Sequence, residues 1–130
     1  MIKTKCAWAT IDRKNDGLRI LVTRYWVRKL KKAACDVWMP NLGPSEPLLK
    51  SYDGGKITWE EFSKRYSEEL REGGSIDKRN RTIKNHGQKF TLRLLQKLGQ
   101  RGKVTLLCHC AERATECHRH LLKKILDGKI

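Results

Sequence analysis

The sequence predicts a small α/β domain, in which a short and largely parallel sheet has helices packed on it. Residues 18–23 and 103–107 are nearly continuous apolar runs, a pattern typical of strands buried on both faces. Helical patterns lie before and after the second run, the order expected of strands joined by crossover helices. The chain of 130 residues is 38% hydrophobic, which is enough for a single domain over residues 1–130 with its own core.

The N-terminal part of the chain supplies the first strands of this sheet. Residues 2–11 contain isoleucine, threonine and tryptophan and predict a strand. Asn15-Asp16-Gly17 predicts a turn before the strand at residues 18–23. The sequence leaves open whether these two strands pair as a hairpin or lie apart.

A less regular region follows the second strand. Residues 24–39 predict either a helical turn or a basic loop, with Trp38 anchored in the core. Three prolines and Gly43 then mark a loop, within which a short helix is expected over residues 45–52.

The clearest helix signal begins at Thr58. Thr58 and Glu61 have the spacing of a capping box, in which the threonine side chain accepts a hydrogen bond from the glutamate amide. An apolar stripe at helical spacing follows and predicts the face that packs on the core. Its members are Trp59, Phe62, Tyr66 and Leu70. Gly73-Gly74 is the expected end of this helix.

The next segments are a loop and a helix. Residues 75–87 are basic and polar without periodicity and predict an exposed loop. A helix over residues 88–98 should end at Gly99. The side chains expected to face the core are Thr91, Leu94, Leu95 and Leu98.

The last helix is predicted over residues 115–126, with Thr115 as its N-cap. His118 lies on its apolar stripe and should face the sheet. The residues expected to point outward are Arg119, His120, Lys123 and Lys124. This N-cap places Cys117 in the first helical turn, where the helix dipole should lower the pKa of its thiol.

The charge of the chain is strongly unbalanced. Lysine and arginine number 29 against 14 acids, a formal net charge of +15. Residues 78–110 and 24–32 contain no acid and hold many of the basic side chains. This segregation predicts a phosphate-bearing small molecule or a nucleic acid as partner, with a merely basic surface as the alternative.

Other features predict the cellular setting. No apolar run approaches the ~20 residues of a membrane span, and residues 1–5 lack the apolar core of a signal peptide. We therefore expect a cytoplasmic protein without a membrane segment. Its five cysteines cannot all pair within one chain, and clustered cysteines in the cytosol are more often metal ligands or reactive thiols than disulfides.

The candidate site lies where the strand at 103–107 passes into the last helix. It contains Cys108, Cys110, Glu112, Cys117 and His118. As a metal site, the four cysteine and histidine side chains suit zinc, although C-x-C-x6-C-H is not a common zinc spacing.

Three further interpretations stay open. In a thiol enzyme, Cys117 or Cys110 would be the nucleophile, His118 the base and Glu112 the orienting group or acid. In a phosphate-binding loop the ligands would be arginines, with the candidates Arg24, Arg28, Arg113 and Arg119. In a basic adaptor protein the cysteines would be buried structural residues. Structural burial is also expected for Cys6 and Cys35.

Spaced motifs in the chain resemble the domain-of-unknown-function family numbered 488. They are residues 16–22 (DGLRILV), 24–26 (RYW), 44–45 (PS), 59–62 (WEEF), 65–66 (RY), 69–70 (EL), 110–112 (CAE) and 117–119 (CHR). The resemblance implies an α/β fold and brings no established activity. The chain departs from the family at Thr23, where an aspartate is usual, and at Val27 and Lys29, which replace a proline and a glycine.

Both motif regions should meet at one edge of the sheet. Arg24 follows one buried strand, and Cys108 ends the other. If these strands are parallel neighbours, Arg24 and Cys108 both lie at the carboxyl edge of the sheet. This is the edge at which α/β proteins bind ligands. We therefore predict one pocket that contains Arg24, Glu112, Cys117 and His118.

Overall fold

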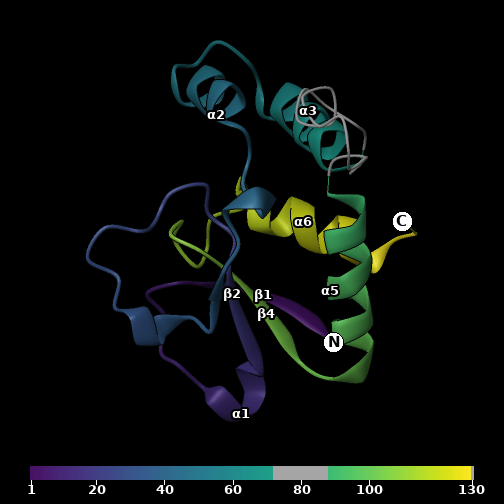
Figure 1. The fold of residues 1–130 in the computed structure, drawn as a ribbon. Coiled ribbons are helices and arrows are strands. Elements are labelled where there is room, and N and C mark those ends of the chain that lie inside the picture. The colour runs from purple at the N-terminus through teal and green to yellow at the C-terminus, as the bar shows by residue number, and fades with distance from the viewer. Residues whose placement is uncertain (72–87, 130) are drawn as a thin grey trace, which may run out of the picture.

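A computed structural model describes residues 1–71 and 88–129 and confirms the predicted α/β class (Figure 1). Its sheet has four strands, all parallel, in the order β1-β4-β2-β3. The strands are β1 (Ile2–Cys6), β2 (Leu18–Leu21), β3 (Val37–Trp38) and β4 (Val104–Cys108). β4 therefore separates β1 from β2, so these two do not form a hairpin, and the two buried strands predicted to be parallel are neighbours.

Helices cover one face of the sheet (Figure 1). The helices are α1 (Arg13–Asp16), α2 (Glu46–Asp53), α3 (Trp59–Arg71), α5 (Lys89–Arg101) and α6 (His118–Asp127), with short 3-10 turns at Lys32–Ala34 and Pro40–Leu42. α6 packs on β1 and β4, α3 and α5 pack against α6, and α2 packs against α3. α6 is thus the central helix of this layer, and its first residue lies at the carboxyl edge of the sheet.

The core divides between the two faces of the sheet. Ile20 and Leu106 point into the large cluster under the helices. Leu21 and Leu107 point to the opposite face, where Leu30 and Ala34 from the loop after β2 cover them. Burial on both faces explains why these strands read as continuous apolar runs instead of alternating ones.

The N-terminal segments differ from the prediction in detail. β1 ends at Cys6, well before residue 11, and the predicted turn at residues 15–17 is preceded by the short helix α1, whose N-cap Asp12 accepts from the Asn15 amide. Gly17 has a φ of 62°, a conformation that favours glycine. Trp38 was expected in the core, but it is 39% exposed because it lies on the edge strand β3, and its indole NH donates to Thr23 O at 2.8 Å.

The helix α3 confirms its predicted start. The Thr58 side chain accepts a hydrogen bond from the Glu61 amide at 3.1 Å, and Phe62, Tyr66 and Leu70 are buried as predicted. α2 likewise matches the expected short helix, with Ser45 as its N-cap. The predicted helix end at residues 73–74 and the predicted basic loop at 75–87 lie outside the described residues.

The buried face of α5 was predicted correctly at Leu95 and wrongly at Leu94 and Leu98. Leu92, Leu95 and Gly99 face the core, whereas Leu94 is 56% exposed and Leu98 is exposed too. Gly99 does not end the helix, which continues to Arg101. A Cβ at this glycine would lie 2.6 Å from Cγ1 of Ile2, so the glycine allows the helix to approach β1 closely.

The last helix begins later than expected. Its N-cap is Cys117, not Thr115, so Cys117 stands before the first turn, and no side chain caps the helix. His118 faces the core as predicted, but Arg119 also points inward and is only 1% exposed. Among the described residues, no helix is both long and apolar enough to cross a membrane.

Candidate functional site

A cavity of about 490 Å³ opens at the carboxyl edge of the sheet. Leu21 of β2 and Leu107 of β4 are register partners, so the loops that follow the two strands leave side by side. Arg24 from the first loop and Cys110, Cys117 and His118 from the second line this cavity together. The cavity thus brings together three of the four residues predicted to share a pocket, while Glu112 is not among the described residues that line it.

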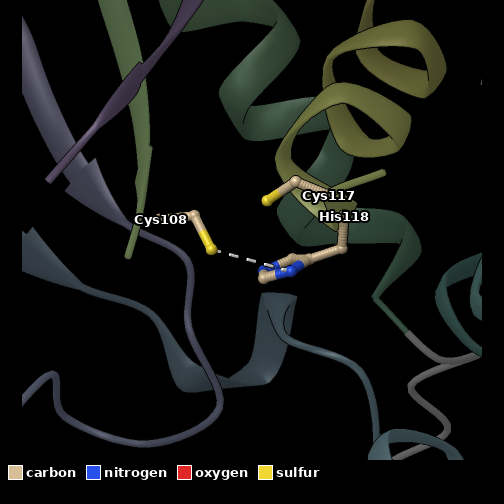
Figure 2. A group of neighbouring side chains, drawn as sticks. All are labelled: Cys108, Cys117 and His118. Atoms are coloured by element: carbon tan, nitrogen blue, oxygen red, sulfur yellow. Dashed lines mark hydrogen bonds between the residues drawn. The ribbon is translucent and has the colours of Figure 1, made fainter. Parts of the chain in front are cut away.

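Three buried ligand atoms converge where Cys117 and His118 line this cavity, and Figure 2 shows the side chains that carry them. Cys108, Cys117 and His118 each supply one of these atoms, and the three atoms all lie within 4.8 Å of one another. Cys108 comes from the end of β4, and the other two come from the start of α6. These residue types suit zinc or another soft divalent metal.

The ring of His118 is held in one orientation. Its Nε2 lies 2.7 Å from Val22 O, and because a carbonyl only accepts, Nε2 carries the proton. Nδ1 therefore presents a lone pair, and it lies 3.9 Å from Cys108 Sγ. Tyr66 packs its ring edge-on against the imidazole. Burial lowers the pKa of His118 to about 4, so the imidazole is neutral at pH 7 and can serve as a metal ligand or a base.

Cys110 stands beside the three buried groups and is itself only partly buried. Cys108 Sγ donates a hydrogen bond to Cys110 Sγ over 3.8 Å. Hydrogen bonds from the thiols of Cys108 and Cys117 hold the pKa of Cys110 below its usual range, and the pKa of Cys108 is raised correspondingly. The thiol that most readily ionises is therefore the most exposed of these three.

Cys117 does not have the acidity that the sequence predicted. A hydrogen bond from Cys108 lowers its pKa, but the bond that Cys117 gives to Cys110 and the burial of its sulfur outweigh this, and its pKa is raised to about 11. The N-cap position also removes the side chain from the first helical turn. In the absence of a metal, Cys117 is a poor nucleophile at neutral pH.

Two of the remaining motif residues hold the loop in place. The Arg119 guanidinium donates to the carbonyls of Cys110 and Ala111, each at 2.9 Å, and to that of Glu112 at 3.3 Å. The Glu112 carboxylate accepts from the Cys6 amide at 2.5 Å and so ties the loop to the end of β1. Arg119 is thus a buried clamp for the loop that carries Cys110, because its Nη1 and Nη2 atoms donate to three carbonyls of that loop.

We expect Arg119→Lys to destabilise the protein by about 2–4 kcal/mol, because one ammonium cannot replace a guanidinium on three carbonyls. Urea unfolding measures this loss. Arg113→Lys is the matched control, since Arg113 is exposed in the same loop. Equal stability of the two variants would contradict the clamp.

The candidate anion-binding arginines separate into two groups. Arg24 and Arg28 line the cavity. Arg24 also donates to Pro44 O at 2.8 Å and to Gly43 O at 2.9 Å, which fixes its side chain at the rim. Arg113 is exposed and is not among the described lining residues, and Arg119 is buried in the clamp.

The sequence analysis missed the aromatic character of this cavity. Its lining includes Trp8, Tyr25, Trp26, Tyr52, Trp59 and Phe62. Trp59 and Phe62 were predicted to face the core, with ligand stacking as a minor alternative, and the stripe to which they belong reaches the cavity at the start of α3. Trp8, Tyr25 and Trp26 each follow a strand end within a few residues, and this position was the available signal.

Comparisons with known proteins agree with the motifs. The protein YeaO of Escherichia coli K12, itself named uncharacterized, is 40% identical over 58 residues, which is 43% of this chain and 50% of YeaO. The uncharacterized protein Rv3073c of Mycobacterium tuberculosis H37Rv is 26% identical over 117 residues, 88% of this chain and 85% of the relative. No solved structure matches the chain. The family model DUF488-N3a, described as the active DUF488-N3 subclade, matches residues 2–129, and the chain therefore belongs to this family.

Proposed function

We propose that this protein is a metal-assisted enzyme, in which Cys108, Cys117 and His118 hold a zinc ion beside the cavity. The observation that carries the proposal is the convergence of three buried ligand atoms within 4.8 Å of one another. Catalytic zinc sites keep three protein ligands and leave one position open to substrate or water. The description of the family as an active subclade supports an enzyme.

The surroundings of the three residues fit such a metal. Hydrogen bonds to Cys110 and burial raise the pKa of both buried thiols, and a divalent ion would favour their ionised forms. Val22 O orients the imidazole as outer partners of zinc-bound histidines do. When bound, zinc would polarise a substrate oxygen or lower the pKa of a water molecule.

Cys110 would be a fourth, partly exposed ligand in this proposal. Its sulfur lies 3.8 Å from Cys108 Sγ, close to the roughly 3.8 Å edge of a tetrahedron with Zn–S bonds of about 2.3 Å. Because Cys110 is partly exposed and the other three residues are buried, it would be the ligand most easily exchanged for substrate if zinc were bound. Arg24 and Arg28 at the rim would receive an anionic group of that substrate.

A metal titration tests these assignments. We expect Cys110→Ser to keep about one zinc per chain with affinity within about tenfold of the unaltered protein, because three buried ligands remain. Competition with a colorimetric chelator measures the affinity. Loss of zinc from Cys110→Ser as complete as that from Cys108→Ser would show a closed four-residue site and would contradict an open position.

A second candidate is a thiol enzyme without metal, and the exposure of Cys110 in the cavity favours it. Here Cys110 would attack the substrate, and Nδ1 of the neutral His118 would accept a proton. Mass-spectrometric labelling of the reduced, metal-free protein, resolved by peptide, tests it. Cys110 should then react faster than Cys35, which is also partly exposed but whose pKa is raised by burial. Labelling of Cys110 no faster than Cys35 would exclude this candidate.

Nucleic acid as a partner stays a prediction from the charge of the chain. The lining of the cavity includes two acids, Asp53 and Glu116, beside its two arginines. A mixed lining of this kind suits a small ligand with both acceptor and donor groups better than a bare polyanion.

A further inference from the structure

The walls of the cavity carry information about the ligand that the metal residues do not. Six aromatic side chains line a space of about 490 Å³, within the size range of small-molecule sites. Two of them are poorly covered, since Trp8 is 54% exposed and Tyr25 is 51% exposed. Large exposed aromatic side chains gathered at the mouth of one cavity are typical of binding surfaces.

One wall is rigid. Trp59 and Phe62 of α3 stack with their ring centres 5.1 Å apart and their planes at 15°. Tyr52 of α2 packs against both rings. The wall is thus preformed, and a flat ligand ring can pack against it without side chains having to be ordered first.

The other side has a fixed aromatic ring as well. Trp26 packs edge-on against Trp38, with ring centres 5.6 Å apart. Trp8 and Tyr25 lie nearby in the lining, from the loops that follow β1 and β2. Aromatic side chains from the loops after β1 and β2, together with those from α2 and α3, suit a planar ring better than a flexible aliphatic chain.

The cavity lining also contains two arginines and two carboxylates. Arg24 and Arg28 belong to the loop after β2 and can bind a phosphate. Asp53 follows Tyr52 on α2, and Glu116 accepts a hydrogen bond from the Tyr52 hydroxyl at 2.9 Å. Carboxylates beside an aromatic wall can accept hydrogen bonds from ring NH and amino groups, which nucleobases carry and plain aromatic acids lack.

We infer that the cavity binds a nucleoside monophosphate, with its base against the aromatic side chains and its phosphate at Arg24 and Arg28. The inference rests on the proposed function in one respect, namely that the same cavity holds the reacting groups. Cys110 lines the cavity together with Cys117 and His118, which are two of the proposed zinc ligands. A nucleotide held in this way would therefore lie beside these groups.

The test is a titration of the protein with four nucleoside monophosphates, followed by tryptophan fluorescence and calorimetry. Ribose 5-phosphate and inorganic phosphate serve as probes that lack the base. At least one nucleotide should bind tenfold or more tightly than ribose 5-phosphate, because stacking of a base on an aromatic ring is worth roughly 5- to 150-fold in affinity.

Two exposed side chains give variants that leave the core intact. Trp8→Ala and Arg28→Ala should each weaken nucleotide binding by about tenfold. Phe90→Ala and Arg101→Ala are the matched controls, since both residues are exposed on α5 and outside the cavity lining, and they should bind as the unaltered protein does. Circular dichroism of every variant checks that the fold is kept.

Three results would overturn the inference: no nucleotide binding below millimolar concentration, ribose 5-phosphate binding as tightly as every nucleotide, or equal losses in the Trp8 and Phe90 variants. Tighter binding of a short single-stranded DNA that does not depend on Trp8 would overturn it as well. The titration is run on zinc-loaded and on chelator-treated protein. If the protein fails to hold zinc, the proposed metal site is contradicted. Nucleotide binding that still depends on Trp8 in that protein would nevertheless support the inference.

Discussion

Replacing Cys108 or Cys117 by serine should weaken zinc binding by more than about 100-fold, because each change removes one of the two buried thiolates that the ion needs. Both sulfurs belong to the set of buried ligand atoms within 4.8 Å of one another. Chelator competition on purified variants measures the change in affinity.

Cys35→Ser is the matched control for these two variants. Cys35 is a free cysteine outside the cluster and follows the 3-10 turn at Lys32–Ala34. Its replacement should leave the zinc stoichiometry and affinity unchanged. If Cys117→Ser held zinc as tightly as Cys35→Ser, the ligand assignment would be wrong.

Asp16→Asn should lower the free energy of unfolding by about 3–5 kcal/mol, which is the usual cost of breaking a buried ion pair by removing one partner. The Asp16 carboxylate is fully buried and pairs with the buried Arg19. Lys3 lies 2.9 Å and Lys5 3.1 Å from it on the neighbouring β1. The asparagine variant leaves Arg19 buried without a counter-charge. Asp127→Asn is the control, because it removes an exposed i,i+4 pair with Lys123 that is worth under about 1 kcal/mol.

The pH dependence of this loss has a definite sign. Burial alone would raise the pKa of Asp16, but the Asp12 amide and the ammonium groups of Lys3 and Lys5 outweigh burial and hold this pKa well below its usual range. A carboxyl with a depressed folded-state pKa stabilises the protein above its unfolded pKa of ~3.9 and loses this contribution as the pH falls further. The difference between the unaltered protein and Asp16→Asn should therefore be full at pH 7 and should shrink below about pH 4. Urea unfolding at pH 7 and below about pH 4 measures the difference in free energy of unfolding between the two proteins. A difference that stayed constant between these pH values would contradict the prediction.

The parts of the fold that the sequence predicted well are those with dense local signals. The runs at 18–23 and 103–107 are nearly continuous apolar runs, as buried parallel strands often are, and both were placed correctly. Thr58 and Glu61 form a self-contained cap, so the start of α3 was predictable as well. The meeting of Arg24 with Cys117 and His118 followed from the parallel pairing alone.

The errors arise where a residue's environment depends on distant parts of the chain. Arg119 was placed outward because it is charged, but its guanidinium is buried against three carbonyls that only the folded loop presents. Gly99 was taken as a helix end, but it is required by the approach of Ile2 from the other end of the sequence. Trp38 was expected inside because it is large and apolar, yet β3 is an edge strand with its indole bonded to Thr23.

The candidate site was predicted in composition but not in the roles of its members. Glu112 was assigned to the chemistry, whereas it accepts the Cys6 amide and anchors the loop. The acidity expected for Cys117 was assigned from helix geometry, but α6 starts at His118, and hydrogen bonds from Cys108 and Cys117 lower the pKa of Cys110 instead. Hydrogen bonds among three thiols depend on distances that spacing along the chain does not give.

The most direct measurement is the metal content of the purified protein, by elemental analysis before and after zinc reconstitution, together with titration of its free thiols. The account predicts about one zinc per chain that resists gel filtration, and thiols of the cluster that react only after a chelator is added. Absence of bound metal after reconstitution, with all five cysteines titrating freely in the folded protein, would contradict it.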